Sequence, residues 1–175
     1  MKPQNYRHDP GKTLVGFSVG EVHYAIAIGQ VREVSSPLPT VALPHAPPSV
    51  LGVADYRGAV VPVVDLRSRF GLPPVSDSRR VKWVLVDLGG RFAALVVDAM
   101  LGVFGSVGLE LRPAPPLGGG EDIRGIRGVT THSQGLVFVL DLSAFQELTA
   151  ALELPAEGGA PSLPPAPTHG KAGAA

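Results

Sequence analysis

The chain contains no cysteine, and aromatic residues make up only 6% of its 175 residues. Without cysteine it can form no disulfide, no thiolate metal site and no thiol nucleophile, and this composition fits a reducing compartment such as the cytoplasm. The scarcity of aromatic side chains predicts a core of aliphatic and β-branched residues. Glycine (22) and proline (18) are abundant instead, which is typical of many short strands joined by tight turns.

The sequence also lacks a charge imbalance and any long apolar run. Its 15 basic and 15 acidic residues are dispersed, which argues against a nucleic-acid partner, since phosphate contacts draw on clustered lysine and arginine. No apolar stretch approaches the roughly 18 to 20 residues that a membrane span needs. The first residues contain no apolar core of a secretory signal. We therefore expect a cytoplasmic protein that makes no direct contact with a membrane.

Catalytic motifs are missing as well. The five histidines lack the spacing of a zinc site, and the chain has no phosphate-binding loop, dinucleotide fingerprint or nucleophile elbow. We predict that the protein is not an enzyme and has no metal, cofactor or catalytic residue. Four aspartates each follow an apolar run, and we interpret them as caps of the next turn rather than as a carboxylate cluster. These aspartates are Asp65, Asp87, Asp98 and Asp141.

Residues 47–71 are the stretch around which the rest of the chain is organised. The six apolar residues 59–64 are too few for a helix and predict a buried strand. Pro62 lies inside this run and has no N–H to donate, so we expect the strand to lie at a sheet edge or to bulge there. Asp65 is expected to cap a short helical turn at residues 66–70.

A second copy of this stretch follows 76 positions later. The Gly-Val pair at positions 52 and 53 recurs at 128 and 129, and residues 136–142 match residues 60–66 at four of seven positions. Two short matches at one offset indicate an internal duplication. A unit of this size is too small to be stable alone, so the copies are expected to share one core. The chain has about ten short apolar or alternating runs in two sets of five, an all-β arrangement typical of small barrels.

Turn signals divide the remaining strands. A glycine-containing dipeptide separates two apolar or alternating runs at two places and predicts a tight hairpin at each. A proline-rich segment, residues 37–48, cannot be regular structure and is expected to form a crossing loop. The two hairpin dipeptides are Gly20-Glu21 and Gly89-Gly90.

The two ends of the chain differ from its centre. Ser143 and Gln146 have the spacing of a capping box, which predicts a short C-terminal helix running to about Glu153. Residues 155–175 are mostly proline, alanine and glycine, a composition that buries too little apolar surface to offset the entropy of ordering. We expect this tail to be disordered and the polar residues 1–12 to be flexible.

One charged pair stands out from this background. Glu33 sits in a short apolar strand, and Arg57 sits in the turn that opens the central strand, so closure of a first barrel would make them neighbours. A surface ion pair usually contributes about 0 to 1 kcal/mol. From the residues alone, the favoured interpretation is an ordinary surface ion pair without a function, and a binding role is the alternative.

Several segments taken together resemble the CheW family of chemotaxis coupling proteins. Each motif is weak alone, but the combination is specific, and it runs from about residue 13 to residue 153. In chain order the segments are Phe17-x-x-Gly20-x-x-x-Tyr24-Ala-Ile, Val31-Arg-Glu33-Val, Gly52-Val-Ala-Asp-Tyr-Arg57-Gly58, Val60-Val-Pro-Val-Val-Asp65-Leu-Arg, Leu95-Val-Val-Asp98 and Val139-Leu-Asp141-Leu.

This resemblance implies a fold of two five-stranded SH3-like barrels around a shared hydrophobic core, which agrees with the internal duplication. It implies one domain, residues 13–154, in which two barrel subdomains are interleaved. Members of the family are non-enzymatic adaptors. They bind the regulatory domain of the histidine kinase CheA and the cytoplasmic tips of chemoreceptors, and so keep the kinase under receptor control within a membrane-associated array.

Three alternatives stay open. Similar adaptors serve other sensory pathways, such as motility or gene regulation, or bind receptors without the kinase. A fragment of a kinase's own regulatory region would carry the same fold. A small β-barrel enzyme is disfavoured by the missing catalytic motifs.

The resemblance also implies a protein-binding site. Glu33 and Arg57 match a glutamate and an arginine that pair near the binding surfaces of the family. A groove between the barrels faces the receptor in the family. Its matching positions here are Ile28, Val31 and Gly52 on one wall and Val103 and Phe104 on the other.

At the binding face the chain departs from the family pattern. It has Asp-Tyr-Arg-Gly at residues 55–58 where the family commonly has Asn-Leu-Arg-Gly. Asp55 adds a negative charge that competes with Glu33 for Arg57. We include Asp55 and Gly58 among the candidate protein-binding residues, and we expect this departure to affect which receptor or kinase the chain accepts.

Overall fold

The computed structural model describes residues 13–75, 78–105, 110–115, 125–133, 135–150 and 152. The predicted flexible N-terminus (residues 1–12) and disordered tail (residues 155–175) lie outside these ranges. The predicted domain limits therefore stay predictions.

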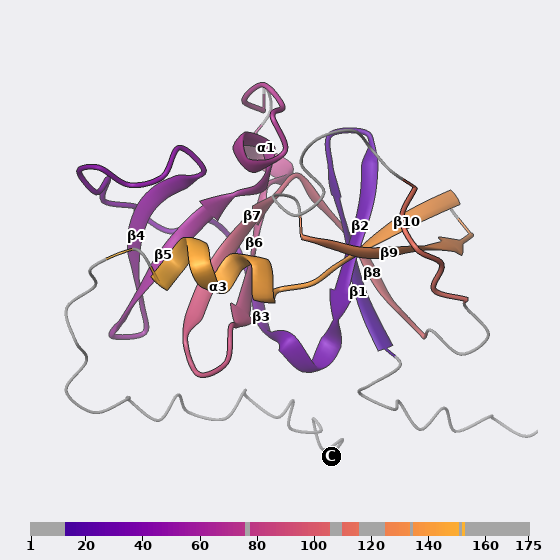
Figure 1. Cartoon of the computed structure of the whole chain (residues 1–175). Coiled ribbons are helices and arrows are strands. Elements are labelled where there is room, and N and C mark those ends of the chain that lie inside the picture. Colours follow the sequence, from indigo (N-terminus) through magenta and orange to yellow (C-terminus); the bar gives the residue numbers. More distant parts are fainter. Residues whose placement is uncertain are drawn as a thin grey trace, which may run out of the picture.

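The described part of the chain forms ten strands in two five-stranded sheets, which confirms the predicted all-β fold (Figure 1). One sheet has the order β8-β1-β2-β10-β9, and the other has the order β3-β6-β7-β5-β4. The strands are β1 (Thr13–Val19), β2 (Val22–Ala27), β3 (Val31–Ser35), β4 (Val50–Tyr56), β5 (Ala59–Asp65), β6 (Lys82–Asp87), β7 (Phe92–Val97), β8 (Ala99–Gly105), β9 (Ile126–His132) and β10 (Gly135–Leu140). The helical elements are η2 (Ile28–Gln30), α1 (Leu66–Arg69), η3 (Ser78–Arg80) and α3 (Ser143–Ala150).

Each half of the duplication contributes its first hairpin to the sheet of the other half. The hairpin β1–β2 pairs with β8 and β10, and the hairpin β6–β7 pairs with β3 and β5. At equivalent places β10 runs parallel to β2, and β5 runs parallel to β7. The two barrels are therefore interleaved, and neither is built from one half of the chain alone. We call the β3-β6-β7-β5-β4 sheet the first barrel and the β8-β1-β2-β10-β9 sheet the second barrel.

Backbone hydrogen bonds repeat with the same spacing as the sequence. Val53 exchanges two bonds with Val41 (2.8 and 2.9 Å), and Val129, 76 positions after Val53, exchanges two with Arg112 (2.9 and 2.8 Å). In each barrel a loop residue thus covers the outer side of an edge strand, β4 or β9. The main chain carries the same duplication that the sequence indicates.

Both predicted hairpins form. Gly20 has a φ of 63° between the paired residues Val19 and Val22. Gly89 and Gly90, between β6 and β7, have φ values of 83° and 92°, which glycine adopts without steric cost. The loop before β4 is irregular, as predicted, apart from the bridge between Val41 and β4.

The expectation that Pro62 marks a sheet edge is wrong, because β5 lies between β7 and β4. Pro62 is tolerated there for a local reason. It faces Val53, whose N–H and C=O both bond Val41 on the far side, so the β4 ladder needs no donor from Pro62. Pairing with β7 begins one residue later, at Val63. The β4–β5 register does shift, but within residues 50–52 of β4 rather than at Pro62.

Three of the four aspartates cap the following turn, as predicted. Their side chains accept backbone N–H groups as follows: Asp65 from Arg67 (2.9 Å), Asp87 from Gly90 (2.7 Å) and Asp141 from Ser143 (2.9 Å). The prediction is wrong for Asp98. Its Oδ2 accepts the Gly20 N–H at 2.6 Å, and both oxygens accept from Arg67 Nε at 2.9 and 3.0 Å. Asp98 therefore joins the turn of β1–β2 to α1.

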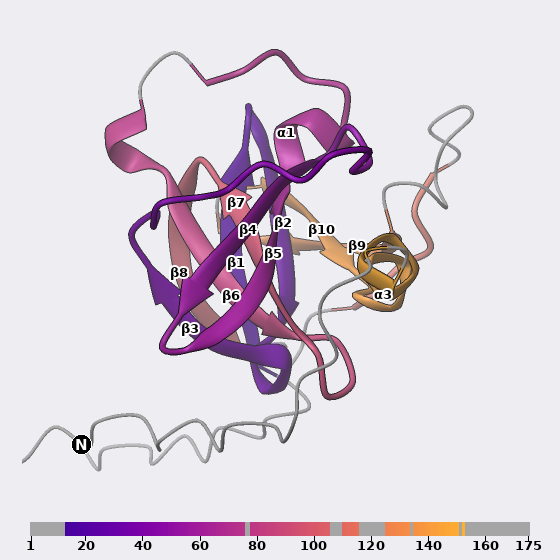
Figure 2. The ribbon, with the colours of Figure 1, turned by 90° about the vertical axis from the view of Figure 1, so that its left-hand side faces the viewer.

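The helix α3 begins at Ser143, but the predicted capping box is wrong. Asp141 accepts the Ser143 N–H, while Gln146 Nε2 donates to the Leu88 carbonyl at 2.8 Å instead of returning to the helix start. The helix follows β10 of the second barrel, yet this bond holds it against the β6–β7 turn of the first (Figure 1). In Figure 2 the same helix is seen end-on beside β9. The predicted extension to Glu153 lies outside the described residues.

Most buried apolar side chains form one cluster shared by the barrels, as predicted. Phe17 and Ile26 come from the second barrel, Val84 and Leu95 come from the first, and all four are fully buried. A second cluster belongs to the first barrel and includes Trp83, which is 4% exposed.

Candidate functional site

The predicted ion pair forms at the seam of the first barrel. Arg57 Nη2 lies 3.0 Å from Glu33 Oε2, and the two side chains are 40% and 35% exposed. Glu33 belongs to β3, and Arg57 follows β4; these are the two edge strands of their sheet. At such exposure the pair contributes about 0 to 1 kcal/mol to stability. Its charges are therefore accessible to a partner and are not essential to the fold.

The β4–β5 turn holds Arg57 in a left-handed conformation. Arg57 and Gly58 have φ values of 54° and 85°, the pattern of a two-residue type I′ turn. Asp55 accepts the Gly58 N–H at 2.8 Å and so stabilises this turn. The carboxylate of Asp55 is engaged there, and Arg57 is paired with Glu33 rather than with Asp55.

Tyr56 belongs to the same cluster, and the sequence reasoning missed it. Its hydroxyl donates to Glu33 Oε2, the oxygen that Arg57 also approaches, and the Arg57 guanidinium lies 5.3 Å from the centre of the Tyr56 ring. Burial, followed by the hydrogen bond to Glu33, raises the pKa of Tyr56 to about 12. The sequence did hold a signal for Tyr56. It directly precedes Arg57, the candidate site residue, and it is the last residue of β4.

Ile28 and Val31 lie at one end of the shared core. Ile28 begins η2, Val31 begins β3, and both are partly buried against the central cluster. Leu14 of β1 pairs on one side with Ala27, the neighbour of Ile28, and on the other side with Phe104. The predicted groove residues on η2 and β8 therefore lie on either side of β1, at one end of the second barrel.

The two predicted residues of the opposite wall differ in exposure. Val103 is 55% exposed. The Phe104 ring lies over Gly16, where an added Cβ would come within 2.6 Å of it, and stacks on His132 with ring centres 4.2 Å apart. Because β8 and β9 are edge strands, this stack joins the seam of the second barrel, as Glu33 and Tyr56 join that of the first. Val103 is thus the better placed of the two to meet a partner.

Gly52 is buried beneath the loop that precedes β4. Its φ is 143°, and an added Cβ would lie 2.0 Å from the Val41 carbonyl oxygen. Glycine is required here because the loop backbone approaches β4 so closely. A partner at this face would meet Val41, whose side chain is 68% exposed, before it met Gly52.

Metal-binding and membrane-spanning features are absent from the described residues. No three histidine, cysteine or carboxylate side chains among them are grouped as metal ligands would be. None of the helices in the described part of the chain has the length and apolar character needed to cross a bilayer.

Comparison with known proteins identifies the family. Residues 13–148 match the family model of the CheW-like domain. The chain belongs to the CheW-like family. The chemotaxis protein CheW of Rhizobium meliloti (strain 1021) is 29% identical over 134 residues, which cover 77% of this chain and 86% of that protein. The probable chemotaxis protein CheW of Rhizobium etli is 27% identical over 133 residues, with coverage of 76% and 86%.

The solved structures lead to the same family. The crystal structure of the scaffolding protein TtCheW from Thermoanaerobacter tengcongensis matches with a TM-score of 0.67 and 27% identity, covering 81% of this chain and 91% of that one. Together with the two sheets described above, this match confirms the predicted fold of two SH3-like barrels. The CheW-like chain is accordingly a chemotaxis adaptor of the scaffolding class.

All predicted protein-binding residues fall within the matched region 13–148. The structure pairs Glu33 with Arg57 and places Ile28 and Phe104 on either side of β1. Which of these CheW-like positions contact a partner stays a prediction.

Proposed function

We propose that this CheW-like chain is a cytoplasmic, non-enzymatic adaptor that couples chemoreceptors to a CheA-type histidine kinase. It meets the regulatory domain of the kinase and the cytoplasmic tip of the receptor, and it reaches the membrane only through them. The observation that supports the proposal is the family match over residues 13–148, since the relatives are chemotaxis and scaffolding proteins. The accessible Glu33–Arg57 pair supports it locally.

Coupling of this kind requires unequal binding rather than chemistry. A receptor that switches between two states passes the change to the kinase if the adaptor binds the two states with different affinity. Contacts of modest area give affinities in the micromolar class, about −8 kcal/mol. Many such contacts in an array then supply stability through multivalency.

Two faces carry the binding in this proposal. The apolar side chains of Ile28, Val31 and Val103 take up side chains of the receptor's helical tip, and the Glu33–Arg57 pair adds polar contacts beside them. A separate apolar face of the first barrel meets the kinase. That barrel has three apolar side chains that are between 40% and 47% exposed, namely Val34, Leu51 and Val60.

The substitution Arg57→Glu tests the proposal. It replaces an attractive pair by two like charges at the barrel seam, and the small contribution of an exposed pair predicts that the fold persists. We expect pull-down of a receptor-tip fragment or of a kinase regulatory domain to weaken by about tenfold or more, because a charge in the interface is reversed. Circular dichroism should stay native.

A matched control is Arg91→Glu, which reverses an exposed charge in the β6–β7 turn. Binding that survives Arg57→Glu unchanged would remove the ion pair from the functional site. If the unaltered chain captures neither a receptor tip nor a kinase domain, the adaptor function itself is contradicted.

A further inference from the structure

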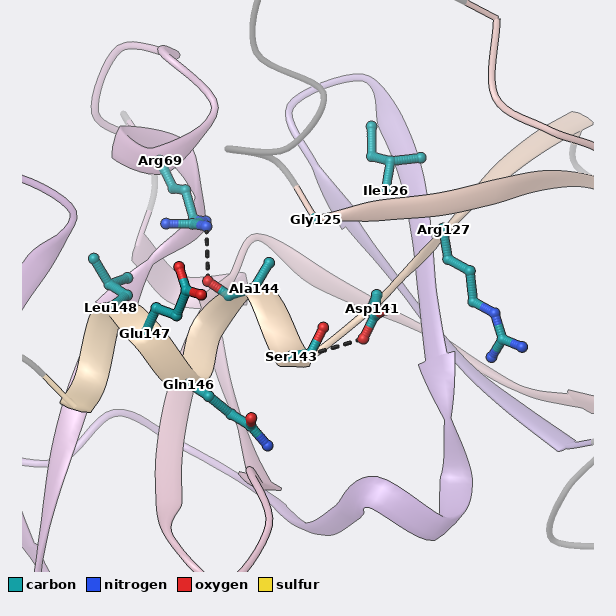
Figure 3. Close-up of a pocket in the computed structure, with 10 residues that line it drawn as sticks. All are labelled: Arg69, Gly125, Ile126, Arg127, Asp141, Ser143, Ala144, Gln146, Glu147 and Leu148. Carbon is teal, nitrogen blue, oxygen red and sulfur yellow. Dashed lines mark hydrogen bonds between the residues drawn. The ribbon is translucent and has the colours of Figure 1, made fainter.

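A cavity of about 690 Å³ opens between α1, α3 and β9, on elements that carry none of the predicted protein-binding residues (Figure 3). Its lining combines charged and apolar side chains. Arg69 comes from α1, Ile126 and Arg127 come from β9, and Glu147 and Leu148 come from α3. The volume far exceeds that of one small ion and suits an amino-acid side chain with its neighbours.

Arg69 is the unusual member of this lining. Its guanidinium lies 4.6 Å from the centre of the Phe145 ring, and Nη2 donates to the Ala144 carbonyl at 3.2 Å (Figure 3). Nε is buried without a hydrogen-bond partner, and burial lowers the pKa of Arg69. The described residues place no carboxylate within ion-pair distance of it. Arginine nevertheless stays charged, so a partly buried cation lines the cavity, and the described part of the chain supplies no counter-ion for it.

The other arginine of the same helix, Arg67, is paired with a carboxylate and serves as a comparison. Arg67 Nε contacts both carboxylate oxygens of Asp98, and Nη1 donates to the Pro73 carbonyl at 2.6 Å. Hydrogen bonding to Asp98 raises the pKa of Arg67, the opposite of the shift at Arg69. Two residues apart on one helix, one guanidinium has a carboxylate partner, and the other has none among the residues that the structure describes.

The charges around the cavity suit a singly charged anion better than a doubly charged one. Arg69 and Arg127 are balanced by Asp141 and Glu147, so a doubly charged phosphate would meet two negative groups. Asp141 is already engaged, since it accepts the Ser143 N–H and its pKa is lowered chiefly by that hydrogen bond. A carboxylate matches the planar guanidinium and carries one charge.

We propose that this cavity binds the carboxylate side chain of a partner polypeptide, with Arg69 as the group that receives it. The apolar side chains Ile126 and Leu148 contact the residues that flank the ligand's glutamate or aspartate. Glu147 opposes binding, because its charge lies in the same cavity. This site is independent of the Glu33–Arg57 pair and of the proposed coupling function.

The test uses the full chain and two capped peptides, acetyl-Leu-Glu-Leu-amide and the matched acetyl-Leu-Gln-Leu-amide. Each is titrated while the backbone amides of Gly125 and Ala144 and the side-chain Nε–H of Arg69 are followed by NMR. We expect saturable shifts with the glutamate peptide. Binding should be about tenfold or more weaker with the glutamine peptide and with Arg69→Gln, since a charged hydrogen bond is lost.

Three further variants sharpen the result. Glu147→Gln should tighten binding of the glutamate peptide several-fold, because a like charge is removed. Arg91→Gln, which changes an exposed arginine that does not line the cavity, should leave the affinity for the glutamate peptide unchanged. Arg69→Lys keeps the charge but not the planar fork and should bind at an intermediate level.

Four outcomes would overturn the proposal. The first is equal binding of the two peptides. The second is unchanged binding of the glutamate peptide by a natively folded Arg69→Gln chain. The third is binding of inorganic phosphate as tight as that of the glutamate peptide. The fourth is a several-fold gain in peptide affinity in the full chain carrying Glu153→Gln and Glu157→Gln, which would assign the site to the protein's own C-terminal residues instead of to a partner.

Discussion

Tyr56 donates its hydroxyl hydrogen to Glu33, and this bond joins β4 to β3 across the seam of the first barrel. The same Glu33 oxygen faces Arg57 at 3.0 Å. One carboxylate therefore serves a buried partner and an accessible one. The buried bond fixes the side chain of Glu33, and the accessible pair presents charge at the surface.

Burial of the Tyr56 hydroxyl, together with its hydrogen bond to Glu33, makes stability depend on pH in the alkaline range. The pKa of Tyr56 is raised from 10.0 to about 12, so between these values the folded chain keeps a proton that the unfolded chain has lost. The stabilisation is fully present below pH 10 and is lost as the pH rises toward 12, by at most about 2.7 kcal/mol. The Tyr56→Phe chain should not show this fall in stability, because phenylalanine has no hydroxyl group to ionise.

Urea unfolding of both chains at pH 8 and near pH 11.5 measures the difference. Other groups titrate equally in the two chains, so the comparison isolates Tyr56. The same fall in the free energy of unfolding for both chains would contradict the assignment.

Gly52→Ala should be strongly destabilising. The added methyl group would lie 2.0 Å from the Val41 carbonyl oxygen at a φ of 143°, so the loop must move and break its two bonds to Val53. We expect a loss of about 3 kcal/mol in the free energy of unfolding, from overpacking and backbone strain. Gly29→Ala is the control, since nothing lies within 4 Å of a Cβ there. Equal stability of the two variants would show that the loop is not held as described.

Substitutions at the neighbouring residues Phe104 and Val103 should differ in their effect on stability. Phe104→Ala empties the space over Gly16 and removes the stack on His132, so it should cost about 1 to 3 kcal/mol of stability. Val103→Ala alters a side chain that is 55% exposed and should change stability by less than about 0.5 kcal/mol. Thermal unfolding of the two variants measures this. A reversed order would mean that Phe104, rather than Val103, is the exposed member of the pair.

Asp98→Asn should loosen the connection between the β1–β2 turn and α1. The carboxylate accepts both the Gly20 N–H and Arg67 Nε, and the Arg67 and Asp98 side chains are only 19% and 17% exposed. We expect a loss of about 1 to 3 kcal/mol, larger than for an exposed ion pair. Asp87→Asn, which affects a single exposed turn, is the comparison. Amide hydrogen exchange at Gly20 should accelerate in the Asp98 variant alone; unchanged exchange would refute the connection.

Local patterns predicted the parts of this fold that depend on neighbouring residues. The glycine turns at residues 20 and 89–90, the cap at Asp65 and the duplication at 76 positions were all visible in the sequence, because turn geometry and strand alternation act over a few residues. The exceptions share one cause. Asp98 and Gln146 each meet a partner far away in the chain, and Pro62 is tolerated because Val53 opposite it bonds the loop residue Val41; no local rule names these partners.

The sequence by itself determined that the chain would fold as two equivalent strand sets around one aliphatic core, since apolar periodicity and repetition are properties of the order of residues. The tertiary structure decided how the halves exchange hairpins, which oxygen Tyr56 and Arg57 share, and that no carboxylate of the described residues lies within ion-pair distance of Arg69. These features depend on contacts between distant segments. Their geometry is fixed only when the two barrels close and pack together.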